Sequence, residues 1–167
     1  MFKVNDYVVY GNAGVCKIET IGPMAIGAAD KDYYTLQPVY QKGSHIFTPV
    51  DNVKVVMRPI LSKEESNQLI DEIEDIDTIE ITDEKAKDEI FKEKLKNCDC
   101  RECVSVIKTL YQRIVKREEQ GKKATSSDER FLHQAQESLY GELAFSLNIE
   151  KNEVEQFITD RIESIHA

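Results

Sequence analysis

The sequence predicts a two-domain α+β protein, in which a small five-stranded β-barrel is followed by an all-α helical bundle. In the first sixty residues, short runs of alternating apolar and polar side chains are separated by glycines and by Asp51-Asn52, as is typical of strands and turns. In the remaining hundred residues, apolar side chains recur at spacings of three and four, which is typical of amphipathic helices. With 167 residues, two small domains are possible, and we expect them at 1–60 and 61–167.

Five short strands are expected in the first domain, at about residues 7–10, 15–21, 32–39, 45–50 and 53–57. Gly11 to Gly14 supply the positive φ angles for a tight reversal after the first strand. So few short strands bury little surface unless the sheet curls on itself, which favours an SH3-like or Tudor-like barrel. The connection after the second strand has an apolar centre, Met24-Ala25-Ile26, where a surface loop would ordinarily be polar.

The helical part is expected to begin after Arg58-Pro59, because proline lacks a backbone donor and disfavours helix in the residue before it. Ser62 to Glu65 has the spacing of a capping box. Further helix starts are expected at Thr82, at Asp99 and at a second capping box, Ser126 to Glu129, and a last helix carries Val154, Ile158, Ile162 and Ile165. The apolar isoleucines 76, 79 and 81 alternate with acids, which suits an extended connector. The pattern predicts four or five helices in a bundle.

The charge is distributed unevenly along the chain. The net charge of −9 argues against tight independent binding to DNA, because neutralisation of phosphates by Lys and Arg provides most of the sequence-independent affinity. Residues 64–90 carry twelve acidic and two basic side chains, whereas residues 108–123 carry six basic and two acidic ones. The basic side chains are the candidate DNA contacts: Lys108, Arg113, Lys116, Arg117, Lys122 and Lys123. The alternative is a solvated helix face with ordinary charge.

The remaining motifs indicate no enzyme. No phosphate-binding loop, Gly-x-Ser-x-Gly motif or Cys-His pair close in sequence is present, so we expect no catalysis, cofactor or small-molecule substrate. No apolar run is long enough to span a membrane, and we expect a cytoplasmic protein. Cys98, Cys100 and Cys103 form one cluster. Zinc usually takes four ligands from two separated pairs, so His133 would have to fold back to complete a site.

Several stretches of the chain match a known family in order. They are Phe2, Val4, Asp6, Val8, Val9, Tyr10, Gly14 and Ile18, then Tyr33 or Tyr34, Leu36, Thr48-Pro49-Val50-Asp51-Asn52, Leu110-Tyr111, Arg113, and Leu139-Tyr140-Gly141-Glu142-Leu143-Ala144. With them the chain resembles the CarD/CdnL family of bacterial transcription regulators. The N-terminal module of that family is shared with the RNA-polymerase-interacting domain of transcription-repair coupling factor.

The resemblance implies a partner and a way of docking. Family members dock on the RNA polymerase β subunit through the connection between the second and third strands and a neighbouring strand, partly by extending its sheet and partly through arginines. Here Met24 and Phe47 stand at approximately the positions of the arginines, which makes Met24, Ala25, Ile26 and Phe47 the candidate polymerase-binding residues. The alternative is that these side chains close the core of the small barrel.

The resemblance also implies that the helical domain acts on promoter open complexes. Family members commonly place a tryptophan in the minor groove at the edge of the transcription bubble, and this sequence contains no tryptophan. We expect weak contact with promoter DNA only within the polymerase complex. Two alternatives stay open: an acidic adaptor on RNA polymerase with no DNA contact, and a regulator that responds to metal or oxidation through its cysteine cluster. Family members tend to have a Ser-Gly-Asp turn where this chain has Asn97-Cys98-Asp99.

Overall fold

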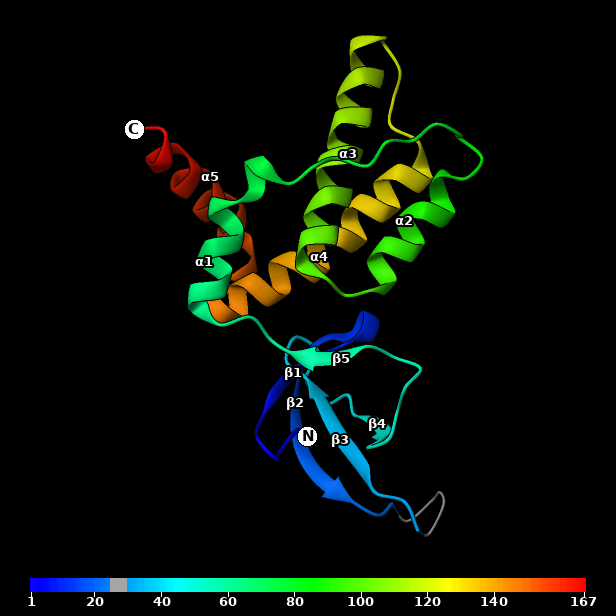
Figure 1. The fold of residues 1–167 in the computed structure, drawn as a ribbon, viewed down its shortest axis with the longest axis vertical. Coiled ribbons are helices and arrows are strands. Elements are labelled where there is room, and N and C mark those ends of the chain that lie inside the picture. The colour runs from blue at the N-terminus through cyan, green and yellow to red at the C-terminus, as the bar shows by residue number, and fades with distance from the viewer. Residues whose placement is uncertain (25–29) are drawn as a thin grey trace. The chain divides into compact units, whose positions relative to one another are not determined.

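The computed structural model describes residues 1–24 and 30–167. The chain divides into two compact units, Met1–Ile60 and Leu61–Ala167 (Figure 1). The first is a five-stranded antiparallel sheet and the second contains five α-helices, which confirms the predicted fold class. Among the residues that the structure describes, no helix is both long and apolar enough to cross a membrane.

The β unit is a bent sheet in the order β4-β3-β2-β1-β5. Its strands are β1 (Tyr7–Tyr10), β2 (Gly14–Gly22), β3 (Tyr33–Pro38), β4 (Ile46–Pro49) and β5 (Met57–Pro59). Gly11 and Gly14 have positive φ angles and turn the chain from β1 into β2, as the sequence predicts. Residues that alternate along the central strands, among them Val8, Ile18 and Leu36, form the core of this unit.

The prediction of the fifth strand at 53–57 was wrong, because that strand begins at Met57. The Asn52 side-chain oxygen accepts from the amides of Lys54 (3.0 Å) and Val55 (3.2 Å), so local hydrogen bonds hold these residues in a loop. Pro59 lies in β5, which is tolerated because β5 is an edge strand.

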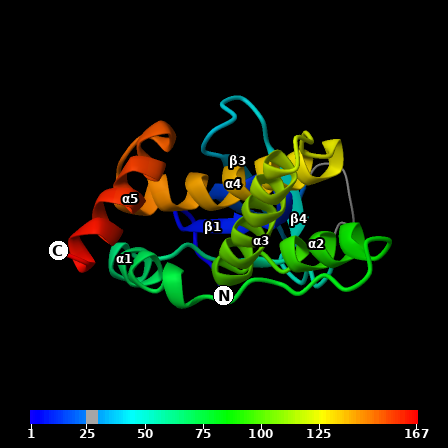
Figure 2. The same cartoon turned by 90° about the horizontal axis from the view of Figure 1, so that it is seen from above.

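The helical unit consists of α1 (Lys63–Asp71), α2 (Lys87–Lys96), α3 (Cys100–Glu119), α4 (Ser126–Leu147) and α5 (Val154–Ile165). Helix α1 packs beside α5, and α3 packs along α4 (Figure 2). The core lies between them, around Ile70, Phe91, Leu110 and Leu143. The predicted capping box at Ser62 is present, since Ser62 Oγ accepts from the Glu65 amide and the Glu65 carboxylate accepts from the Ser62 amide.

Two predicted helix starts were wrong. The second helix begins at Lys87 and not at Thr82, because the Asp83 side chain accepts from the Lys85 amide and closes a turn before the helix. The cap of α4 is Thr125 and not Ser126: Thr125 Oγ1 accepts from the Asp128 amide at 3.2 Å. The shift places Asp128 at the third helical position, where its side chain lies inside the unit.

Candidate functional site

Strand β4 is a free edge of the sheet in the part of the chain that the structure describes. It pairs with β3 on one side, with Phe47 opposite Thr35 and Thr48 opposite Tyr34. Side chains alternate between faces along a strand, so Thr48 is buried whereas Phe47 is 51% exposed. Phe47 is therefore a surface aromatic residue and not part of the core of the β unit.

The other predicted polymerase-binding residues lie beyond the end of β2. Met24 is half-buried and stands outside any strand. Ala25 and Ile26 lie outside the described residues. The β unit has several further exposed apolar side chains: Val4, Ile21, Tyr40, Val53, Val55 and Val56.

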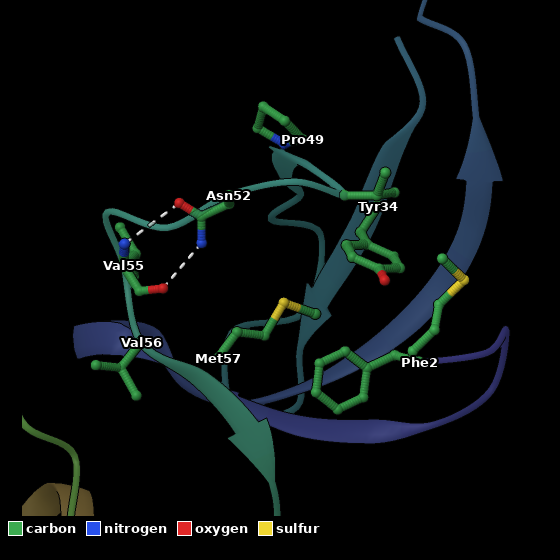
Figure 3. Close-up of a pocket in the computed structure, with 9 residues that line it drawn as sticks. Phe2, Tyr34, Pro49, Asn52, Val55, Val56 and Met57 are labelled. Carbon is green, nitrogen blue, oxygen red and sulfur yellow. Dashed lines mark hydrogen bonds between the residues drawn. The ribbon is translucent and has the colours of Figure 1, made fainter.

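A pocket of about 480 Å³ opens in the β unit where β4 ends and β5 begins (Figure 3). The Phe2 and Tyr34 rings meet edge to face at 6.2 Å, and Met57 lies beside them. The Asn52 amide, which donates to the Val55 carbonyl at 2.8 Å, holds the loop on the opposite wall. No sequence pattern predicts this pocket, although the stretch Thr48 to Asn52, which matches the family, contributes residues to its wall.

The six predicted DNA contacts do not form one continuous stripe. Lys108 Nζ donates to the carbonyls of Ile73 (2.9 Å) and Ile76 (2.5 Å), so it ties α3 to the connector after α1. Arg117 is half-buried, and its Nε donates to the Lys123 carbonyl at 2.7 Å. Three exposed lysines remain at or near the end of α3: Lys116, Lys122 and Lys123.

Arg113 belongs to a cluster of charged side chains that the sequence analysis did not foresee. Its Nε donates to Asp128 Oδ2 at 3.1 Å, and its Nη1 and Nη2 each donate to Glu84 at 2.9 Å. Lys87 Nζ lies 2.6 Å from Asp128 Oδ1 and 3.6 Å from Asp88. The cluster thus joins the turn before α2 to α2, α3 and α4.

The cluster shifts the pKa values of Asp128, Glu84 and Arg113. Burial raises the pKa of Asp128, but hydrogen bonds from Lys87 and Arg113 outweigh that effect and hold it below its ordinary value. The hydrogen bond from Arg113 lowers the pKa of Glu84, and the same bond raises the pKa of Arg113. Asp128, Glu84 and Arg113 therefore stay charged at neutral pH. The packing of α2, α3 and α4 against one another brings these side chains together, and no local motif in the sequence indicates it.

The cysteines do not form a metal centre. In residues 1–24 and 30–167, no three His, Cys, Asp or Glu side chains are grouped so that they could hold a metal ion. Cys103 is buried and its thiol donates to the Ala135 carbonyl at 3.2 Å, whereas Cys100 Sγ lies 3.1 Å from Glu142 Oε1. His133 is exposed on α4. The geometry gives the zinc alternative no support.

Glu142 has a structural role that the sequence analysis did not assign. It is buried on α4, and its Oε2 accepts from the Leu61 amide at 2.9 Å. Glu142 therefore holds the first residue of the helical unit against α4 at the same time as it contacts Cys100 at the start of α3. In the sequence, the stretch Leu139 to Ala144 stands out as a family match and by the helical spacing of its leucines, and neither feature indicates this role of Glu142.

Part of the acidic surface is paired within the helical unit. Asp71 accepts from Arg161 at 2.6 and 2.9 Å, Glu72 contacts Arg101, and Glu74 lies 2.6 Å from His166 Nε2. These contacts join α1 and the segment after it to α3 and to the end of α5.

Both units match models of known protein domains. The family model described as CarD-like/TRCF RID domain matches residues 2–61, and the one described as CarD, C-terminal domain, matches residues 68–159. The two matches follow each other in the family order, coincide with the sheet and the helices, and confirm the resemblance predicted from the sequence. The chain therefore belongs to the CarD family of transcription regulators, whose N-terminal domain interacts with RNA polymerase.

Proposed function

We propose that this chain is a non-catalytic regulator that holds the RNA polymerase β subunit with residues 1–60 and adjusts promoter open complexes with residues 61–167. The observation that carries the first half is the free edge of β4 with Phe47 exposed on it. A strand of the partner can add to this edge, because backbone hydrogen bonds supply affinity while a few side chains select the partner. Phe47 and Met24 are the proposed selecting side chains, together with Ala25 and Ile26.

The second half of the proposal concerns DNA. The exposed Lys116, Lys122 and Lys123, together with Arg117, supply the positive charge at the end of α3. Three or four phosphate contacts give weak binding at physiological salt. The logarithm of the binding constant falls with the logarithm of the salt concentration, with a slope of about −0.9 per contact. Weak contact suffices when polymerase delivers the protein, since tethering raises the effective concentration. A difference of about 1.4 kcal/mol in binding between two promoter intermediates changes their ratio tenfold.

The β-subunit contact is tested by measuring binding of the purified chain to an isolated fragment of the β subunit that contains its exposed sheet edge. Phe47→Glu should weaken binding at least about tenfold, because it places a charge in an apolar contact. Val53→Glu is the matched control, since Val53 is 94% exposed but lies outside β4. Equal binding by wild type and Phe47→Glu would refute docking through β4.

The DNA contact is tested through the lifetime of open complexes formed with polymerase. The double substitution Lys116→Glu and Lys122→Glu should remove the effect of the protein on that lifetime. Lys92→Glu with Lys96→Glu is the control, because both lysines are exposed on α2 and the change in charge is the same. If both double variants act like wild type, the DNA half is wrong.

The second candidate is an adaptor that recruits a basic partner through its acidic helical surface without contacting DNA. The twelve acidic side chains in residues 64–90 favour it. The internal pairing of Asp71, Glu72 and Glu74 with basic groups of the same unit leaves less of that charge for a partner. An adaptor predicts that neither lysine variant changes polymerase-dependent activity.

A further inference from the structure

Arg113 is held by two carboxylates that differ in their surroundings. Asp128 accepts from Nε at 3.1 Å and is completely buried, whereas Glu84 accepts from Nη1 and Nη2 and its side chain is 69% exposed. The guanidinium group therefore has an inner contact, from Nε to the buried Asp128, and an outer contact, from Nη1 and Nη2 to the exposed Glu84. We call Nη1 and Nη2 together the fork of Arg113. The outer carboxylate lies at the surface of the molecule.

The inner contact is fixed without any help from Glu84. Asp128 receives a second charged hydrogen bond from Lys87 at 2.6 Å. Its backbone amide is bonded to the Thr125 cap, which fixes Asp128 in the first turn of α4. Removal of the Glu84 carboxylate would thus leave the Arg113 plane anchored by Asp128, with the fork directed to solvent.

Glu84 binds Arg113 through two hydrogen bonds in a geometry that other oxyanions can also adopt. It lies in the turn before α2, outside any helix, and the turn itself is closed by hydrogen bonds of Asp83. The Glu84 side chain is 69% exposed and that of Arg113 is 20% exposed, so only the carboxylate side of this ion pair is open to solvent. The two parallel N–H···O bonds match the geometry in which arginine binds phosphate as well as carboxylate.

We propose that the fork of Arg113 is a phosphate-binding site and that Glu84 covers it in the free protein. The chemistry is that of a phosphodiester or phosphate monoester with two oxygens in the plane of the guanidinium group. Arg117 stands one helical turn further along α3, and Lys116 lies between them in sequence, so a phosphate chain along this end of α3 would meet further cations. That the phosphate belongs to nucleic acid rests on the proposed function, whereas the phosphate site itself does not.

The site is tested with the full chain by following the Arg113 Nε–Hε resonance during titration with inorganic phosphate. In Glu84→Ala, we expect a saturable shift of this resonance at phosphate concentrations that leave the wild type unchanged. Glu80→Ala is the control, because Glu80 is an exposed acid in the same connector and its removal changes the net charge equally. Glu84→Gln is a second variant that keeps the size of the side chain.

The source of the phosphate is tested by binding of the same variants to a short DNA duplex across a range of salt concentrations. Glu84→Ala should bind about three- to fivefold more tightly than wild type, since removal of the carboxylate makes Nη1 and Nη2 available for one further phosphate contact. For this variant, the slope of the logarithm of the binding constant against the logarithm of the salt concentration should become steeper by about 0.9, the value for one added phosphate contact. The binding constant of Glu80→Ala should have the same dependence on salt concentration as that of wild type.

The outcomes separate this inference from the proposed function. If the Arg113 resonance of Glu84→Ala and Glu84→Gln persists but does not respond to phosphate, the phosphate site is refuted, even where the duplex still binds through Lys116 and Lys122. If phosphate shifts the resonance and no variant binds the duplex, the site takes a small phosphate ester, and the DNA half of the proposed function is decided separately by the open-complex lifetimes. If Glu84→Ala and Glu80→Ala gain the same affinity for phosphate and for the duplex, the gain is due to the change in net charge alone. That result would refute the covering role of Glu84.

Discussion

Asp128 is the side chain on which the charged cluster of the helical unit depends. It is completely buried and carries hydrogen bonds from Lys87 and Arg113, so its loss leaves two cations without their buried partner. Breaking a buried ion pair by removing one member costs about 3–5 kcal/mol. We expect Asp128→Asn to lower the free energy of unfolding by about 3 kcal/mol in urea denaturation. Glu129→Gln, one residue away and exposed, should change it by less than about 0.5 kcal/mol.

The pH dependence of stability follows from the lowered pKa of Asp128. A carboxylate with a folded-state pKa below its unfolded value of 3.8 contributes stability above that value, and the contribution is lost as pH falls through the folded-state pKa. The difference in stability between wild type and Asp128→Asn should therefore be constant from pH 7 to about pH 5 and shrink below about pH 4. Urea denaturation at a series of pH values measures it. A difference that grows on acidification would contradict the assigned charge state.

The four cysteines should react at different rates. Burial raises the pKa of Cys16 to about 11, so almost none of it is thiolate at neutral pH. Cys103 is buried and bonded to the Ala135 carbonyl, whereas Cys98 is only half-buried, in the turn between α2 and α3. Peptide mapping after brief treatment with a maleimide at pH 7 should find Cys98 modified first, and Cys16 and Cys103 only after unfolding. Early modification of Cys16 would argue against its place in the core.

For single side chains, the sequence indicates which residues are charged or apolar but does not indicate which groups they contact. Alternation along a strand places Phe47 and Thr48 on opposite faces, but it left open which of the two faces is exposed. The internal bonds of Lys108 and Arg113 could not be expected, because a basic residue on a helix has the same local sequence whether a carbonyl, a carboxylate or solvent lies opposite. The Glu142 contact with Leu61 joins positions 81 residues apart, and no local pattern reports it.

Helix α4 ends at a residue in the left-handed region. Asn148 has φ 57° and ψ 47°, and its amide donates to the carbonyls of Ala144 and Phe145. Asn148→Gly should keep the stability within about 0.5 kcal/mol, whereas Asn148→Val should lower it by about 1–2 kcal/mol, because a branched side chain is strained in this region. Thermal unfolding measures both, and Asn152→Val, an exposed site in the turn that follows, is the control. Equal effects of the two valines would rule out a special role for the cap.

The elements with strong local signals were the ones that could be predicted. Ser62 with Glu65 marked the start of α1, and the glycines after Tyr10 marked the first turn. The errors arose where a short polar side chain bonds its own backbone. Asn52 holds Val55 out of a strand that the valines alone favour, and Asp83 closes a turn where a helix cap was expected. Both residue types suit caps as well as turns, so sequence alone does not separate the two outcomes.

The two units have cores of different size. In the described part of the β unit the central cluster contains five buried side chains, whereas that of the helical unit contains fourteen. Because stability grows with buried apolar area, the β unit should open at lower free energy. Native-state hydrogen exchange should find the amides of β1 to β3 less protected than those of α3 and α4. Equal protection in both units would indicate one cooperative molecule.

The division of the whole chain follows from the change in apolar period near Pro59, which is visible in the sequence. The two matched domain models, covering 2–61 and 68–159, fall on either side of this change. The pocket beside Phe2 could not be foreseen, because it requires the N-terminal segment, β3 and the loop after Asn52 to meet in space.

The open edge of β4 also bears on how copies of the chain behave in concentrated solution. Backbone groups that accept a partner strand accept a second β4 equally well, so the edge is a route to self-association. Three features oppose it: β4 has only four residues, Pro49 ends it, and a net charge of −9 makes copies repel one another. Salt screens that repulsion over about 8 Å at physiological ionic strength. Colloidal stability therefore depends on the acidic helical unit, whose charge opposes pairing between the open β4 edges of two copies.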